Sequence, residues 1–186
     1  MTKPFAEATE AFRDGPAELR PVIYPGINKK TGKKLGKQCL ESGWQLPNHM
    51  LPKGTQERWL RECGHWNVGL NMGTVLSDGT RLGGIDIDHD DHVNLGKVLL
   101  RNPPSGRFGS KGALFFVRYL PTVGKTQRLS VKNQPEDGYG QVLELLFDGT
   151  LCVIPPSIHP DTGQPYRWIG TPLYEIDLLT LPLIGE

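Results

Sequence analysis

Apolar residues recur at helical spacing in a few segments of the chain, and most of these segments end near glycine or proline. One such segment follows Thr55, which we interpret as the N-cap of a helix with Trp59 and Leu60 on its buried side. The predicted helices span residues 5–13, 55–63 and 91–100.

Short apolar and alternating runs predict more strands than helices. The turn sequences Asp78-Gly79 and Asp148-Gly149 each lie between two such runs, which predicts two β-hairpins. The 23 glycines and 16 prolines argue against a bundle of long helices, and the interleaved elements indicate the α+β class. The predicted strands span residues 22–24, 66–71, 82–88, 113–119, 142–147 and 151–154.

The composition is that of an ordinary globular protein, with 37% hydrophobic and 22% charged residues in a chain of 186. This length suffices for one domain with a substantial core. We therefore expect a single domain over residues 1–186, with approximate lobes at 1–64 and 65–186, because the pattern becomes strand-rich after Gly64.

The sequence indicates a soluble protein of the cytoplasm. Its three cysteines are widely spaced, which favours reduced thiols over a disulfide framework. Cys63 and His65 offer two metal ligands, whereas a structural zinc site uses four. We find no signal-peptide core and no apolar run of membrane-spanning length, so no membrane partner is expected.

The net charge of +1 conceals an uneven distribution. Acidic residues gather at Asp86, Asp88, Asp90 and Asp91, whereas basic residues gather in another stretch. This asymmetry suits a protein that meets a polyanion at one surface and binds metal at another, although a solvated basic loop explains the lysines equally well. The basic stretch contains Lys29, Lys30, Lys33, Lys34 and Lys37.

The segment Ile85-Asp86-Ile87-Asp88 is the leading candidate for chemistry. Side chains alternate along a strand, so both aspartates point to one face while the isoleucines point into the core. Two carboxylates so close together repel each other unless a cation lies between them, and Mg²⁺ or Mn²⁺ suits such hard oxygen ligands. The alternative is a strand that ends in a solvated acidic turn.

Glu144 provides a third carboxylate, inside the otherwise apolar run from Val142 to Leu146. Glutamate is rarely buried in such a strand unless it is paired or binds metal. Together with Asp86 and Asp88 it would complete a two-metal site. The alternative places Glu144 on the open face of a half-exposed strand.

Two loops offer further polar groups. The glycine-rich segment 105–112 carries Arg107, Ser110 and Lys111, whose charges suit phosphate, but it lacks the Gly-Lys-Ser/Thr ending of a Walker A loop. His159 follows the rigid Pro155-Pro156 pair, where it either contacts a triphosphate or caps the turn. Taken alone, each loop is better explained by ordinary loop structure.

The order of these motifs resembles the bifunctional primase/polymerase domain of the archaeo-eukaryotic primase superfamily. The resemblance runs from about Tyr24-Pro25 to the C-terminus. It rests on residues 66–73, on 84–88 as the first acidic motif, on 144–157 as the third motif with its hairpin, and on 159–168, which resembles phage and prophage members. Many members carry a small-x-His motif between the two acidic motifs, and residues 106–116 contain no histidine.

The resemblance implies an archaeo-eukaryotic primase-like core, in which an N-terminal α/β lobe packs on an RRM-like mixed or antiparallel sheet. It implies template-directed nucleotidyl transfer on single-stranded DNA with primer, by a DNA primase or polymerase of a phage, prophage or plasmid, with a fused or separate replicative helicase as partner. Metal binding by Asp86, Asp88 and Glu144 would engage two Mg²⁺ or Mn²⁺ ions. Nucleoside triphosphates would contact Arg107, Ser110, Lys111 and His159, and DNA would contact Lys29, Lys30, Lys33 and Lys34.

Two other functions fit the same residues. The three carboxylates also suit a metal-dependent nuclease that activates water on a phosphodiester. A non-catalytic DNA-binding module that recruits a helicase is the third possibility, which the missing histidine makes conceivable.

Overall fold

The computed structural model of the protein describes residues 2–123, 127–130 and 141–185. It is α+β, as predicted, with few helices and mostly antiparallel strands. The helices are α1 (Pro4–Ala11), α2 (Thr55–Cys63) and α3 (Asp90–Leu99), with short 3-10 turns at Asn48–Met50, Pro121–Val123, Leu173–Glu175 and Leu178–Thr180. None of the described helices is long and apolar enough to cross a membrane.

The strands form a small and a large sheet and one short hairpin. The small sheet has the order β1 (Leu19–Val22), β4 (Asn67–Asn71) and β10 (Leu151–Ile154). The large sheet has the order β11 (Arg167–Gly170), β6 (Ser105–Phe108), β7 (Ala113–Tyr119), β5 (Arg81–Ile87), β9 (Gln141–Leu146) and β8 (Gln127–Ser130), and β12 (Leu183–Ile184) pairs in parallel with β7. β2 (Gly26–Ile27) and β3 (Lys34–Leu35) form the hairpin.

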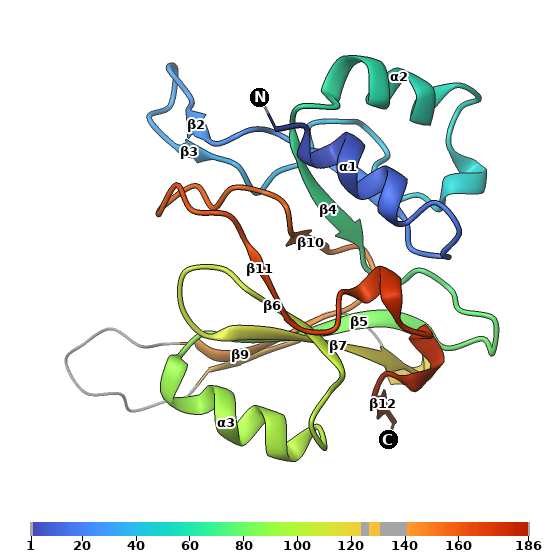
Figure 1. Ribbon diagram of the computed structural model, residues 1–186, viewed down its shortest axis with the longest axis vertical. Coiled ribbons are helices and arrows are strands. Elements are labelled where there is room, and N and C mark those ends of the chain that lie inside the picture. Colours follow the sequence, from blue (N-terminus) through green and yellow to red (C-terminus); the bar gives the residue numbers. More distant parts are fainter. Residues whose placement is uncertain (1, 124–126, 131–140, 186) are drawn as a thin grey trace.

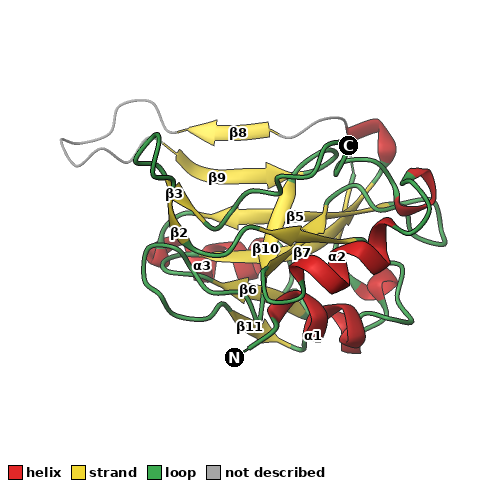
Figure 2. Ribbon diagram, turned by 90° about the horizontal axis from the view of Figure 1, so that it is seen from above, coloured by secondary structure: helices red, strands yellow, loops and turns green. Residues whose placement is uncertain are grey.

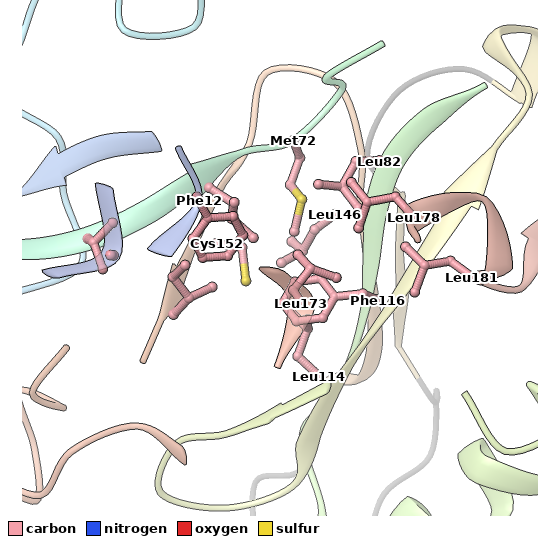
Figure 3. Close-up of a cluster of buried hydrophobic side chains, with 14 of the residues drawn as sticks. Phe12, Met72, Leu82, Leu114, Phe116, Leu146, Cys152, Leu173, Leu178 and Leu181 are labelled. Atoms are coloured by element: carbon pink, nitrogen blue, oxygen red, sulfur yellow. The ribbon is translucent and has the colours of Figure 1, made fainter. Parts of the chain in front are cut away.

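The sheets and helices lie in layers (Figures 1 and 2). One hydrophobic cluster fills the space between the sheets and includes Leu70 of β4. Cys152 of β10 and Phe116 of β7 belong to the same cluster (Figure 3). α1 and α2 contribute Phe5 and Trp59 to the same cluster. On the opposite face of the large sheet, a second cluster around Phe115 and Ile87 is covered by α3. The large sheet is therefore packed on both faces.

Neither predicted hairpin pairs the two strands expected of it, although residues 73–76 fold back on residues 80–82 around the Asp78-Gly79 turn, where Val75 is bridged to Arg81. β4 lies in the small sheet and β5 in the large one, and β9 and β10 are divided in the same way. Both turns instead carry the chain from one sheet to the other, and they meet where Met72 donates its N–H to the Thr150 carbonyl at 2.9 Å. A turn sequence signals a reversal of the chain, but hydrophobic packing between the sheets decides which strands pair.

Other local predictions need smaller corrections. The strand expected at residues 22–24 is β1, three residues earlier, because it pairs antiparallel with β4 over Leu19 to Val22. Thr55 is the first residue of α2, and Gly54 in a left-handed conformation precedes it as N-cap. Trp59 is buried at 1% exposure, but Leu60 is 39% exposed, since successive helical residues point about 100° apart. The small sheet combines β1, which precedes residue 64, with β4 and β10, which follow it.

Candidate active site

A row of side chains crosses the large sheet on the face that looks toward the small sheet. Asp86 of β5 lies directly opposite Glu144 of β9 and Leu114 of β7, and Arg107 of β6 lies opposite Leu114. Opposed residues in antiparallel strands project their side chains to the same face. Asp86, Glu144 and Arg107 therefore share a face with Leu114, which belongs to the cluster between the sheets.

Asp86 lies beside a buried cation. Its Oδ2 is 3.6 Å from Nη2 of Arg107, and the two side chains are 27% and 13% exposed. Burial raises the pKa of the Asp86 carboxyl, and the negative charges of Asp88 and Glu144 add to the rise. Arg107 and Lys37 oppose it. The site therefore holds an excess of negative charge that favours a further cation.

Asp88 lies one residue beyond the end of β5 and is half-buried. Its Oδ2 is buried and has no hydrogen-bond partner among the described residues, and the same is true of Nε of Arg107. A buried polar atom without a partner costs about 1–3 kcal/mol. Two such atoms on residues near Asp86 mark this region as a place for a polar ligand.

The carboxylates are of the right kind for a divalent metal but are not gathered around one point. Within the described part of the chain, no three His, Cys, Asp or Glu side chains lie close enough together to hold a metal ion. Asp86 and Glu144 lie directly opposite each other on neighbouring strands, and Asp88 comes two residues after Asp86 along the chain. The donor set and the unpartnered Asp88 oxygen fit a hard cation, whose binding would draw these oxygens together.

Arg107 is enclosed by groups of the small-sheet side. Its Cζ lies 5.2 Å from the centre of the Tyr166 ring, and Cys152 of β10 is a close neighbour. Burial, the largest single influence, lowers the pKa of Arg107, but Asp86, Cys152 and Tyr166 together outweigh it and hold that pKa above its usual value. Burial raises the pKa of Cys152 to about 11 and that of Tyr166 to about 12. At neutral pH the arginine is thus charged while both neighbours are neutral.

The loop between β6 and β7 passes over the end of β5. Gly112 has φ of 61°, and a Cβ there would lie 1.7 Å from the Ile87 carbonyl oxygen, so no larger residue fits. Its N–H donates to Oδ1 of Asp90 at 2.7 Å. The predicted phosphate contacts Ser110 and Lys111 are exposed on this loop, close along the chain to Gly112.

His159 is buried at 3% exposure next to Tyr166, with ring centroids 5.2 Å apart. Its Nδ1 accepts the N–H of Asp161 at 3.2 Å, which leaves Nε2 to carry the proton. Burial lowers the pKa of His159, and Lys37 lowers it further. Tyr166 thus connects His159 to Arg107 through two ring contacts.

The β2–β3 hairpin carries the predicted DNA-binding lysines. Lys29, Lys30 and Lys33 are exposed near its end, whereas Lys34 forms an ion pair with Asp161. Gly36 lies against Pro160, since a Cβ at that glycine would be 2.9 Å from the proline Cβ. The hairpin is therefore held against the loop that carries His159, and both lie on the same side of the molecule (Figure 1).

Three further residues contribute to this site in ways that were not predicted from the sequence, which indicated only a core or base-stacking role for Tyr166. Lys37 lowers the pKa of both Asp86 and His159, but nothing in the sequence distinguishes it from the other lysines of the run. Tyr166 and Cys152 enclose Arg107. Only tertiary packing brings these residues of β10 and the following loop to β6.

An α+β protein that presents acidic and basic groups on one sheet face is suited to phosphate chemistry. The chain belongs to the family described as bifunctional DNA primase/polymerase, N-terminal, which matches residues 17–182, nearly its whole length. No curated protein matches it. Family membership identifies a nucleotidyltransferase-type protein of DNA replication with DNA and nucleotides as substrates.

Proposed function

We propose that the protein copies single-stranded DNA by template-directed nucleotidyl transfer, as a primase, a polymerase or both. The observation that carries this proposal is the register that sets Asp86 opposite Glu144, with Arg107 on the same face. The fully charged arginine suits a triphosphate, and the shared face brings acid and base within one site. The phage, prophage or plasmid setting and the replicative helicase partner belong to the same proposal.

Asp86, Asp88 and Glu144 would hold two Mg²⁺ or Mn²⁺ ions. When bound, the metal supplies charge stabilisation for the attacking 3′-hydroxyl and for the departing pyrophosphate. The unpartnered Oδ2 of Asp88 supports this assignment. Arg107, Ser110 and Lys111 would bind the triphosphate.

His159 has a narrower role in this proposal. Because its Nδ1 is engaged by the Asp161 N–H, only Nε2 is left to donate a hydrogen bond to a phosphate oxygen. Lys29, Lys30 and Lys33 would lie along the template, with Lys34 next to them in its ion pair with Asp161.

The decisive experiment replaces the opposed carboxylates by their amides. We expect Asp86→Asn and Glu144→Gln each to lower primer synthesis and extension by at least a hundredfold, because each amide loses a negative charge at the metal while it keeps its size. The assay uses single-stranded DNA with mixed nucleotides, with and without primer, in Mg²⁺ and in Mn²⁺. Circular dichroism and thermal melting check that each variant is folded.

The matched control is Asp78→Asn, which changes the same group in the turn before β5, where Asp78 pairs with Arg118. It should keep its activity. Full activity of Asp86→Asn or Glu144→Gln in both metals would disprove the proposed site. Shortening of labelled single-stranded DNA with metal but no nucleotides would indicate a nuclease instead.

A further inference from the structure

A small groove opens on the outer rim of the large sheet, next to the candidate active site. It has a volume of about 320 Å³ and lies between residues 108–110 and the segment that carries Thr162, Gln164 and Arg167. This volume is at the lower end of the range for small-molecule sites, about 300–1,000 Å³. The groove therefore suits a single nucleotide unit.

The groove contains an arginine guanidinium group that lies over an aromatic ring. Phe108 ends β6 and Arg167 begins β11, and the two are directly opposed in the antiparallel register. Cζ of Arg167 lies 5.2 Å from the centre of the Phe108 ring. Phe108 is half-buried and Arg167 is exposed, so the pair is accessible to solvent. A phenyl ring and a guanidinium plane are the surfaces on which unpaired bases stack.

The remaining lining has the polarity of a nucleotide site. Ser110 and Thr162 carry hydroxyls and Gln164 carries an amide. Among the described lining residues Arg167 is the one charged group, and it is a cation. A groove with a cation, an aromatic ring and no carboxylate is complementary to a base and its phosphate.

The groove adjoins the candidate active site, because Phe108 of the groove directly follows Arg107 of the site along β6. Gly109 lies between Phe108 and Ser110, and a Cβ at Gly109 would lie 2.9 Å from Cε1 of Tyr166 and 3.2 Å from Nη1 of Arg107. Because strand residues alternate, Arg107 projects toward the site and Phe108 to the other face. A DNA strand that crosses this rim would pass from the groove to the face of the sheet that carries the site.

We propose that Phe108 and Arg167 form a stacking platform for an unpaired base of the single-stranded DNA that the site copies. The inference rests on the proposed function for the identity of the strand. It assigns to this groove the binding of DNA, while Arg107 and Lys111 contact the triphosphate; Ser110, proposed above as a triphosphate contact, also lines the groove.

The test measures binding of a fluorescein-labelled single-stranded oligonucleotide by anisotropy, without metal or nucleotides. We expect Phe108→Leu and Arg167→Ala each to raise the Kd about tenfold, in line with the loss of one stacked base. Phe108→Tyr should bind within about twofold of the wild type, because it keeps the ring. Arg61→Ala is the control for charge, since it removes an exposed arginine on α2.

An abasic oligonucleotide of equal length separates stacking from a change in fold. On this strand Phe108→Leu should bind as the wild type does, because no base is present to stack. The platform is disproved if Phe108→Leu binds the intact strand normally, if it weakens both strands equally, or if the wild type binds neither. Primer extension by the wild type is measured separately. If the stacking platform is disproved, the polymerase proposal is unaffected, and if the wild type shows no extension, the binding result can still be interpreted.

Discussion

At the scale of single residues, the site contains ionisable groups whose pKa values are shifted by burial. Asp86 is harder to ionise than a free carboxyl because it is buried beside two other acids, and Arg107 is its nearest cation. His159 is buried in its neutral form, with Lys37, Asp161, Arg107 and Lys34 as the charged groups that act on it. Burial of these polar groups costs desolvation free energy that a surface residue does not lose.

The lowered pKa of His159 predicts how stability depends on pH. The unfolded histidine titrates near 6.5, above its folded pKa, so the unfolded state takes up a proton first as the pH falls. The stability that neutral His159 contributes is thus present above pH 6.5 and is lost as the pH falls through the folded pKa. We expect urea unfolding of the wild type to lose more free energy between pH 7 and 5 than unfolding of His159→Gln.

The comparison between these two proteins isolates His159, because their carboxylates and other histidines are the same. At pH 7 the variant should be less stable, since glutamine lacks the ring that packs on Tyr166. Equal pH slopes for the two proteins would contradict the interpretation.

At the scale of elements, the meeting of the two sheet-to-sheet turns is the feature that fixes the fold. Asp148 in the β9–β10 turn accepts the Tyr119 hydroxyl at 2.6 Å and forms an ion pair with Arg81. It also presses against Gly73 in the β4–β5 connection, where a Cβ would lie 2.2 Å from Oδ1 of Asp148. The two crossings are thereby held together between the sheets.

This contact predicts a large effect for one glycine. Gly73→Ala should lower the free energy of unfolding by about 3 kcal/mol, because Gly73 has φ of 95° and no space for a methyl group. Gly79→Ala is the matched control, since Gly79 has φ of 82° with no atom within 4 Å of its Cβ position. It should cost about 1 kcal/mol from backbone strain alone. Chemical denaturation measures both, and equal losses would refute the steric argument.

At the scale of the whole molecule, charge is distributed so that one side is suited to nucleic acid. The net charge is only +1, yet the exposed lysines of the β2–β3 hairpin stand beside the loop of His159 (Figure 1). A local excess of cations attracts a polyanion even when the total charge is near zero. The hairpin and the rim groove are the two separate places that we propose to hold a DNA strand.

Replacement of Lys29, Lys30 and Lys33 by alanine should weaken single-stranded DNA binding and make it less dependent on salt. Each lost phosphate contact lowers the slope of log K against log salt by about 0.7 for a single strand, so the slope should fall by up to about 2. Anisotropy titrations at several salt concentrations measure this slope.

The control removes the same number of positive charges elsewhere, through Lys3, Lys53 and Arg61, all of which are exposed. An equal fall in slope for both triple variants would show a general charge effect and not an interface at the hairpin.

Several features of this protein follow from local sequence alone. Strand β7, the helices α2 and α3 within one residue, and the inward direction of Ile85 and Ile87 were all predicted, because side-chain periodicity is a property of neighbouring residues. The grouping of Asp86 with Asp88 rests on the same periodicity.

Only the tertiary structure decided which strands lie side by side. The turn sequences at Asp78 and Asp148 predicted hairpins, but burial of both faces of the large sheet placed the flanking strands in different sheets. The same packing set Glu144 opposite Asp86 and enclosed Arg107 between Tyr166 and Cys152. Contacts between residues far apart in sequence depend on how hydrophobic surfaces pack together, and a local sequence pattern does not determine that packing.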